Sequence, residues 1–260
     1  MTAPQLRTER EGPVGRVILD NQARRNAISA SMWRDMPVAL AAFNADPEVR
    51  CIVLRGAGTE AFAAGADISE FEQRRSSEAD VKAYEAQITA AHHAIETSAK
   101  PVIALIHGFC VGGGMAVALS CDLRYADTAA RFAIPAARLG LGYGVSGTGR
   151  LVATVGHAAA REIMFTARRY DAQEALAMGL VHRVLPPDEL DRYVQEVASG
   201  IAANAPLTIA ASKTVINALA APQGDFTAAR AAVEACMRSE DYIEGRRAFM
   251  EKRTPQFKGR

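Results

Sequence analysis

Short apolar runs alternate with helix-like segments over the first half of the chain, and this alternation constrains the fold more than any other feature. The runs are rich in β-branched residues, as buried strands are. They cover residues 16–20, 51–54, 101–106 and 123–126. Between the second and third runs, residues 81–95 carry apolar side chains at helical spacing. Strands that alternate with helices predict an α/β fold with partly parallel strand pairing.

The second half of the chain has a different character. Beyond about Gly140, strand signals nearly disappear, apart from residues 181–185, and helical patterns dominate. The helical runs are 171–178, 187–203, 205–220 and 226–250. We therefore expect a core over residues 1–200 and a helical region over residues 201–260. A C-terminal block of helices like this one often packs on another subunit.

Composition argues against several classes of function. Thirty basic residues against 29 acidic ones leave a net charge of +1, which predicts neither a nucleic-acid partner nor a membrane surface. The four cysteines form no C-x-x-C pair, so we expect buried, reduced thiols. Residues 1–12 lack the apolar stretch of a secretory signal, and glycines interrupt the apolar stretch 101–121. A cytoplasmic protein without membrane spans is expected.

Two other patterns do not support a dinucleotide or metal site. Residues 142–147 match G-x-G-x-x-G but follow no clear strand, so dinucleotide binding is not expected. The histidines show no metal-ligand spacing, and we expect solvated or core side chains. They are His92, His93, His107, His157 and His182.

The segment 61–68, Ala-Phe-Ala-Ala-Gly-Ala-Asp-Ile, follows the second apolar run after a short loop. Its small side chains would let a ligand approach the main chain and its N–H groups. The same residues could instead form a plain strand-to-helix connection, with Asp67 capping the helix start. Both interpretations stay open for this motif alone.

The segment 107–115, His-Gly-Phe-Cys-Val-Gly-Gly-Gly-Met, ends a strand and opens a helix near Gly113. The first N–H groups of a helix have no partner inside it, and the helix dipole favours negative charge nearby. The turn is therefore a candidate site for a negative oxygen. Close packing of the helix on a sheet would explain the glycines equally well.

Together the two segments resemble the crotonase, or enoyl-CoA hydratase/isomerase, family, which has A-G-A-D in the first segment and G-G-G in the second. The similarity extends over nearly the whole chain and includes residues 25–28, 239–242 and 249–253. It implies an α/β fold, a spiral of ββα units with a C-terminal helical oligomerisation region. It also implies an acyl-CoA substrate, no cofactor beyond the CoA moiety of that substrate, and a homotrimer or dimer of trimers.

The resemblance also implies an oxyanion hole. In this family two backbone N–H groups bind the thioester carbonyl oxygen, and motif position implies that they belong to Ala64 and Gly113. That oxygen gains charge as the substrate becomes an enolate. Fixed donors therefore stabilise the transition state more than the ground state.

The chain departs from the family at both acid/base positions. Family hydratases use two glutamates around the substrate double bond, one after the G-G-G turn and one after a proline further along. Here these positions hold Ala116 and Ala136 in the substrate pocket, and a methyl group cannot move a proton. The resemblance therefore does not imply ordinary hydration or double-bond isomerisation.

Residues 139–144 are similar to a Leu-Gly-x-x-Tyr run of methylmalonyl-CoA decarboxylases in the same superfamily. The similarity implies that Tyr143 faces a substrate carboxylate, with simple packing as the alternative. Loss of carbon dioxide leaves an enolate without a general base, which suits the two alanines. The match is partial, because those decarboxylases have histidine where this chain has Ala66.

Other residues are assigned to the site by their motif positions. Asp67 is the remaining polar candidate for catalysis, with helix capping as its alternative. Ile68 and Leu141 are expected to line the substrate pocket. Residues expected to contact the CoA moiety, unless the basic ones only form a solvated face, are Arg24, Arg25, Ala66, Lys252 and Phe257.

Three functions follow from this pattern. The chain could be an atypical hydratase or a malonyl-type decarboxylase that holds an acyl-CoA enolate. The emptied acid/base positions also allow a non-catalytic acyl-CoA-binding protein.

Overall fold

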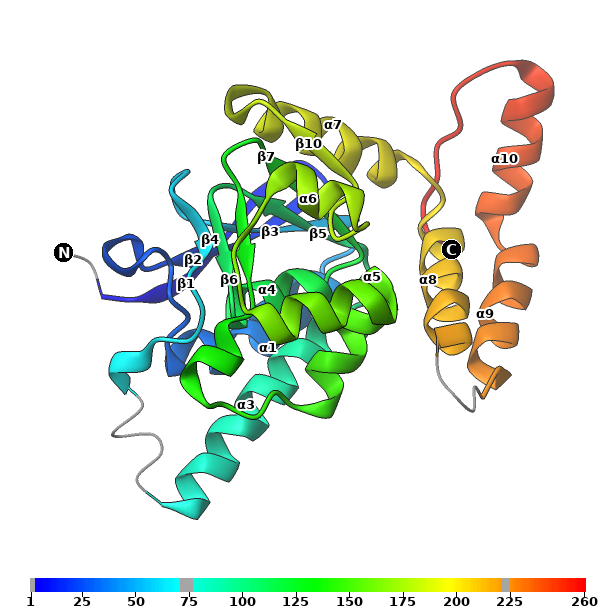
Figure 1. The fold of residues 1–260 in the computed structure, drawn as a ribbon. Helices are drawn as coiled ribbons and strands as arrows, with labels where there is room; N and C mark the ends of the chain where they lie inside the picture. The colour runs from blue at the N-terminus through cyan, green and yellow to red at the C-terminus, as the bar shows by residue number, and fades with distance from the viewer. Residues whose placement is uncertain (1–2, 71–76, 221–224) are drawn as a thin grey trace.

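The computed structural model describes residues 3–70, 77–220 and 225–260. Its main layer is a six-stranded sheet in the order β1-β2-β3-β5-β7-β10 (Figure 1). The strands are β1 (Gln5–Glu11), β2 (Val14–Asp20), β3 (Cys51–Gly56), β5 (Val102–Ile106), β7 (Leu123–Asp127) and β10 (Arg183–Leu185). β1 pairs with β2 antiparallel, and the other neighbouring strands pair parallel. The parallel pairing confirms the α/β prediction.

A second sheet, of four strands, has the order β4-β6-β8-β9. Its strands are β4 (Ala61–Ala63), β6 (Phe109–Val111), β8 (Arg131–Ala133) and β9 (Tyr170–Asp171). Along the chain, β3 is followed by β4, β5 by β6 and β7 by β8, and a helix follows each of these pairs. The predicted spiral of ββα units is therefore confirmed.

Helices cover both faces of the main sheet. One face carries α1 (Ala30–Ala45), α3 (Glu78–Glu96), α4 (Gly113–Ser120) and α5 (Val145–Thr166). Helix α7 (Pro187–Ala203) covers the other face, and α6 (Ala172–Ala177) precedes it (Figure 1). Successive strand residues point to opposite faces. Ile52 and Leu54 of β3 accordingly enter the larger core, whereas Cys51 and Val53 pack with α7.

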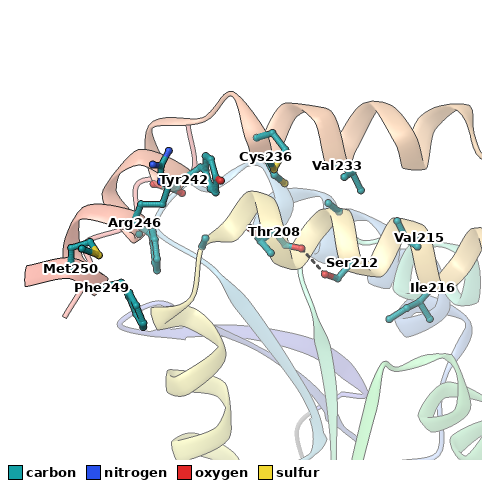
Figure 2. Close-up of a pocket in the computed structure, with 16 residues that line it drawn as sticks. Thr208, Ser212, Val215, Ile216, Val233, Cys236, Tyr242, Arg246, Phe249 and Met250 are labelled. Carbon is teal, nitrogen blue, oxygen red and sulfur yellow. Dashed lines mark hydrogen bonds between the residues drawn. The ribbon is translucent and has the colours of Figure 1, made fainter. Parts of the chain in front are cut away.

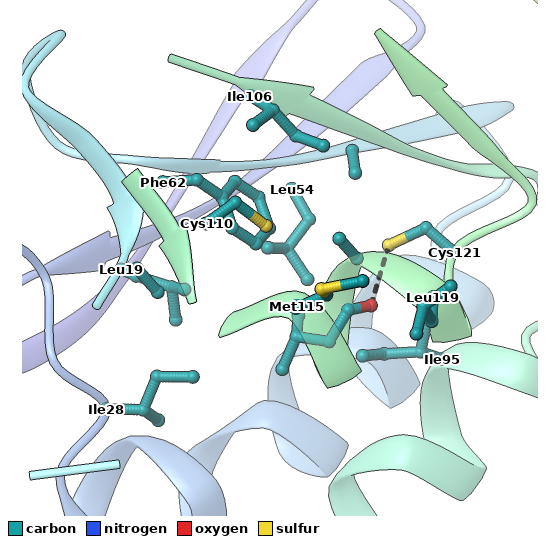
Figure 3. Packing of buried hydrophobic residues seen from close by; sticks show 14 of the residues in the cluster. Leu19, Ile28, Leu54, Phe62, Ile95, Ile106, Cys110, Met115, Leu119 and Cys121 are labelled. Carbon is teal, nitrogen blue, oxygen red and sulfur yellow. Dashed lines mark hydrogen bonds between the residues drawn. The ribbon is translucent and has the colours of Figure 1, made fainter. Parts of the chain in front are cut away.

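The larger core surrounds helix α4, which begins at the glycine turn. Figure 3 shows Met115 and Leu119 of α4 among Leu54, Ile95 and other buried side chains. Because α4 is buried on nearly every side, its first residues are held rigidly at the edge of the smaller sheet.

Three helices follow the core: α8 (Pro206–Ala220), α9 (Thr227–Met237) and α10 (Glu240–Glu251). They stand apart from the two sheets (Figure 1). The end of the chain returns to them, where the Asp241 carboxylate accepts hydrogen bonds from the N–H groups of Lys258 and Gly259 at 2.6 and 2.8 Å. In the three described ranges, no helix is long and apolar enough to cross a membrane.

Candidate functional site

The segment after β4 is held by the loop that precedes α1. The Ile28 N–H donates to the Gly65 carbonyl at 2.8 Å, and the Asp67 N–H donates to the Ile28 carbonyl at 2.9 Å. Gly65 has a φ of +115°, which side chains rarely adopt. These bonds and this turn fix the direction of the next amide, that of Ala66.

The glycine turn packs against β4 so closely that side chains would not fit. A Cβ at Gly114 would lie 2.3 Å from the Ala63 carbonyl oxygen. Gly112 has a φ of +53°, and its N–H donates to the Ala133 carbonyl of β8 at 2.8 Å. Helix α4 therefore begins at Gly113, with its N-terminus directed at the end of β4.

The amides of Ala66 and Gly113 lie side by side. A Cβ at Gly113 would lie 3.2 Å from the Ala66 nitrogen, and one at Gly65 would lie 3.7 Å from the Gly113 nitrogen. Neither N–H donates to an acceptor among the described residues. Two adjacent unpaired donors at a helix N-terminus can bind one negatively charged oxygen.

The prediction that Ala64 supplies one of these donors is wrong. The Ala64 N–H donates to the Arg25 carbonyl at 2.9 Å, so it is not available to a ligand. Ala66, expected to contact the CoA moiety, presents the unpaired amide instead. The physical reason is the turn at Gly65, which separates the directions of the two amides.

The two alanines at the acid/base positions are buried beside this turn. Ala116 lies on α4, and Ala136 lies in the 3-10 helix Pro135–Leu139 that follows β8. Pro135 comes within 3.9 Å of a Cβ placed at Gly112. The fold therefore brings both positions to the glycine turn, and neither carries a group that exchanges protons.

The remaining pocket predictions have different outcomes. The Tyr143 hydroxyl is buried without a hydrogen-bond partner in the described part of the chain, and burial raises the Tyr143 pKa. The Leu141 side chain is exposed rather than enclosed in the single chain. Ile68 lies in the 3-10 helix Ile68–Glu70, but its side chain is outside what the structure describes.

Asp67 is engaged in contacts that stabilise the loop. Its carboxylate pairs with Arg24 at 2.7 Å and accepts hydrogen bonds from the N–H and hydroxyl of Ser69. Burial alone would raise the Asp67 pKa, but these hydrogen bonds and the Arg24 charge lower it overall. An ionised, fully bonded carboxylate is a poor general base, so the capping alternative agrees with the geometry.

The predicted CoA contacts fall into two separate groups. Arg24 and Arg25 lie beside the site, where Arg24 binds Asp67 and Arg25 pairs with Glu60 at 2.7 Å. Lys252 and Phe257 follow α10 in the separate C-terminal region (Figure 1). One chain therefore does not bring the two groups together.

Sequence reasoning missed the role of Asn26. Its side-chain amide donates to the carbonyls of Ala57 and Ala61 at 2.9 and 2.7 Å, and its oxygen accepts from the Asn21 N–H. The side chain thus ties the loop before α1 to the start of β4. The motif at residues 25–28 marked this segment, but suggested contacts with the nucleotide instead.

The buried His107 joins an ion cluster that reaches the surface at Asp191. Its Nδ1 and Nε2 bond Asp127 and Asp191 at 2.8 and 2.6 Å, and Arg55 also pairs with Asp191. Burial alone would lower the His107 pKa, but the two carboxylates raise it to about 9. The cluster joins the ends of β5 and β7 to α7.

Known proteins share this arrangement along the whole chain. The family profile described as enoyl-CoA hydratase/isomerase matches residues 9–260. The chain is 37% identical to a short-chain-enoyl-CoA hydratase of Clostridium acetobutylicum, with 94% of each chain covered. It is 36% identical to a carnitinyl-CoA dehydratase of Proteus mirabilis, with 96% of each covered.

Solved structures agree with the sequence comparison. An enoyl-CoA hydratase/carnithine racemase from Magnetospirillum magneticum superposes with a TM-score of 0.95 at 36% identity, over 100% of this chain and 97% of that one. A putative enoyl-CoA hydratase/isomerase family protein from Hyphomonas neptunium gives a TM-score of 0.93 at 39% identity, over 98% of each chain. The chain therefore belongs to the enoyl-CoA hydratase/isomerase, or crotonase, family.

Proposed function

We propose that this chain is an enzyme that binds an acyl-CoA thioester and stabilises its enolate with the backbone N–H groups of Ala66 and Gly113. The observation that carries the proposal is the pair of adjacent, unpaired amides at the start of α4. The thioester carbonyl oxygen would lie between them. No cofactor beyond the CoA moiety of the substrate is needed for this chemistry.

The two donors act on the charge that develops during the reaction. As the enolate forms, the thioester oxygen becomes more negative, and hydrogen bonds to it strengthen. The donors are main-chain groups fixed by a buried helix, so they need no reorganisation at the transition state. Loss of one such donor typically raises the barrier by about 3 kcal/mol.

The two alanines favour a reaction in which the substrate itself supplies the electrons. In decarboxylation of a malonyl-type ester, the bond to the carboxylate breaks, carbon dioxide leaves, and the electron pair stays on the α-carbon as an enolate. Solvent then protonates that carbon. Ala116 and Ala136 hinder hydration, because no carboxylate at either position can activate water.

Hydration remains the second candidate function. It is supported by the relatives of this chain, which include a short-chain-enoyl-CoA hydratase and a carnitinyl-CoA dehydratase. A water bound near the site would then have to act without either glutamate. A non-catalytic acyl-CoA-binding protein is the alternative if no ester reacts.

Mass spectrometry of CoA esters incubated with the purified protein separates these functions. The panel would contain crotonyl-, methylmalonyl- and aromatic enoyl-CoA. Loss of carbon dioxide supports decarboxylation, and gain of water supports hydration. Binding without any conversion would contradict the proposal that the protein is an enzyme. It would support a non-catalytic acyl-CoA-binding protein.

We also propose that the protein is a homotrimer or a dimer of trimers. A groove of about 1100 Å³ opens between α8 and the pair α9–α10 (Figure 2). Phe249 and Met250 beside it are 81% and 80% exposed, which is unusual for large apolar side chains. In such an assembly Lys252 and Phe257 would contact the CoA of a neighbouring subunit.

We also propose that the protein is cytoplasmic. All four cysteines are unpaired, and unpaired cysteines are typical of a reducing compartment. Burial raises the pKa of Cys51 and Cys121 to about 12, so these thiols are unreactive.

A further inference from the structure

Three buried hydrogen-bond donors lie on the helices around the candidate site or in the loop that leads into one of them. Trp33 Nε1, Tyr143 Oη and Arg150 Nε have no acceptor among the residues that the structure describes. A buried donor left without a partner costs about 1–3 kcal/mol, so such groups are normally bonded. Three of them in one region indicate an acceptor that the chain itself does not provide.

Trp33 places one donor next to the proposed oxyanion hole. The residue is 1% exposed and lies on α1. Its Cζ2 atom would be 3.4 Å from a Cβ at Gly113, and the indole nitrogen is two bonds from Cζ2. An acyl group attached to a thioester at Gly113 would therefore pass the Trp33 N–H.

His92 continues the polar surface from Trp33. The two ring centroids are 5.5 Å apart. His92 Nδ1 lies 2.9 Å from the Ser120 hydroxyl, which donates to the Ala116 carbonyl at 3.1 Å. Because that hydroxyl proton is used, Nδ1 is the donor to Ser120 and Nε2 is left as an acceptor. Burial lowers the His92 pKa to about 3, so the ring is neutral.

Arg150, on α5, and Tyr143, two residues before α5 begins, complete the cluster. Arg150 pairs with Glu96 at 2.9 Å, one helical turn beyond His92 on α3. The Tyr143 ring packs on the first turn of α5, where a Cβ at Gly147 would lie 2.8 Å from its Cε1. Gly147 and Arg150 are three residues apart on α5 and so lie on the same face of the helix, which brings Tyr143 and Arg150 to the same side of α5.

The charges in this region determine which functional group of a ligand can bind there. Glu96 already neutralises Arg150, His92 is neutral, and the buried Tyr143 hydroxyl stays protonated. A second carboxylate would enter without a free cation to balance it, which is unfavourable away from water. A hydroxyl or oxo group suits the available donors, and a hydroxyl could also donate to His92.

We propose that the acyl chain of the substrate carries an uncharged oxygen function, a hydroxyl or an oxo group, which accepts hydrogen bonds from Trp33, Tyr143 and Arg150. This inference rests on the proposed function, since it requires a thioester bound at Ala66 and Gly113. It concerns the acyl chain beyond the β-carbon, where hydration of an enoyl-CoA would itself introduce a hydroxyl. It does not concern the carboxylate that a decarboxylation would remove from the α-carbon.

Calorimetric binding to the full chain tests the inference. The ligands are hexanoyl-CoA, hydroxy- and oxohexanoyl-CoA with the oxygen at successive carbons from the fourth, and adipoyl-CoA, each checked by mass spectrometry after the titration. We expect at least one hydroxy or oxo ester to bind about tenfold or more tightly than hexanoyl-CoA. Adipoyl-CoA should show no such gain.

Two variants test whether the preference for oxygenated esters depends on the donors of Trp33 and Tyr143. Trp33→Phe and Tyr143→Phe each remove one donor and keep most of the ring. Each should reduce the preference, measured as the ratio of the affinities for the oxygenated ester and hexanoyl-CoA, severalfold. Tyr193→Phe on α7 is the matched control and should keep the full preference. If Trp33→Phe does not fold, Tyr143→Phe decides alone.

Equal binding of plain and oxygenated esters would overturn the inference. A preference for adipoyl-CoA would also overturn it, as would a preference that survives in both variants. These results are distinguishable from failure of the proposed function. If the protein binds no acyl-CoA at all, both fail; if it binds plain esters without preference, the inference alone fails.

Discussion

Ala64 and Ala66 flank one glycine, and among the described residues only the Ala64 amide has a hydrogen-bond partner. The sequence identified the motif and Gly113, but motif position pointed to the wrong alanine. The difference depends on the Gly65 φ of +115° and on the Arg25 carbonyl that takes the Ala64 N–H. Neither the backbone angle nor a contact between residues so far apart in sequence can be read from local pattern.

The contacts of Asn26 with residues distant in sequence could not be predicted from local pattern either, and they predict a role in stability. Asn26 and Arg25 both have positive φ, at 55° and 51°, so glycine fits the backbone at either position. Asn26→Gly should lower the free energy of unfolding by about 2–3 kcal/mol, because two buried carbonyls lose their donor. Urea unfolding measures the change. The matched variant Arg25→Gly removes an exposed side chain, and an equal loss there would contradict the assigned role.

At the scale of elements, the apolar strands of the main sheet and the helix with clear apolar spacing were predictable, whereas three-residue strands, a polar edge strand and a glycine-rich helix start were not. Strands β3, β5 and β7 and helix α3 lie where the sequence indicates them. Strand β1 was missed because it is an exposed, polar edge strand. Strands β4, β6 and β8 have three residues each, too few for alternation to show. Helix α5 was missed, since its first turn is rich in glycine.

The ion cluster between β5, β7 and α7 predicts how stability depends on pH. The folded-state pKa of His107 is about 9, against an ordinary value of 6.5. Protonation of His107 therefore stabilises the fold fully below pH 6.5, and this contribution is lost as the pH rises to about 9. The loss should be at most about 3 kcal/mol.

Urea unfolding at a series of pH values checks this prediction. His92 acts in the opposite direction, because its pKa is lowered to about 3 and acid below pH 6.5 favours the unfolded chain. Stability should therefore be greatest near pH 6.5–7. The variant Asp191→Asn should flatten the alkaline limb and leave the acid limb unchanged. An identical alkaline limb in wild type and variant would exclude the cluster as its source.

For the whole molecule, two motifs and scattered matches along the chain were enough to predict the spiral fold. The motifs were sufficient because the fold requires small residues there: Gly114 packs closely on Ala63, and the turn at Gly112 requires glycine. Composition could not show how the C-terminal helices are placed. Their separation from the sheets (Figure 1) and the exposed Phe249 and Met250 became visible only in the structure.

The exposed C-terminal face predicts the state of assembly. Phe249→Glu introduces a charge that a packed apolar interface would have to bury. Native mass spectrometry should show trimers or hexamers for the wild type and mostly monomers for the variant. Val38→Glu, at an exposed apolar side chain of α1, is the control and should assemble normally. A monomeric wild type would contradict the proposed assembly.

The most direct test of the account compares two variants at Gly113, the first residue of α4. Gly113→Ala adds a Cβ and keeps the N–H, whereas Gly113→Pro adds a ring and removes the N–H. Proline is well tolerated at the first helical position, and thermal unfolding would verify that both variants fold. On the ester that the wild type converts, we predict that kcat/KM of Gly113→Pro is about 100-fold or more below that of Gly113→Ala. Equal rates in the two folded variants, with Gly113→Ala close to the wild type, would contradict an oxyanion hole formed by Ala66 and Gly113.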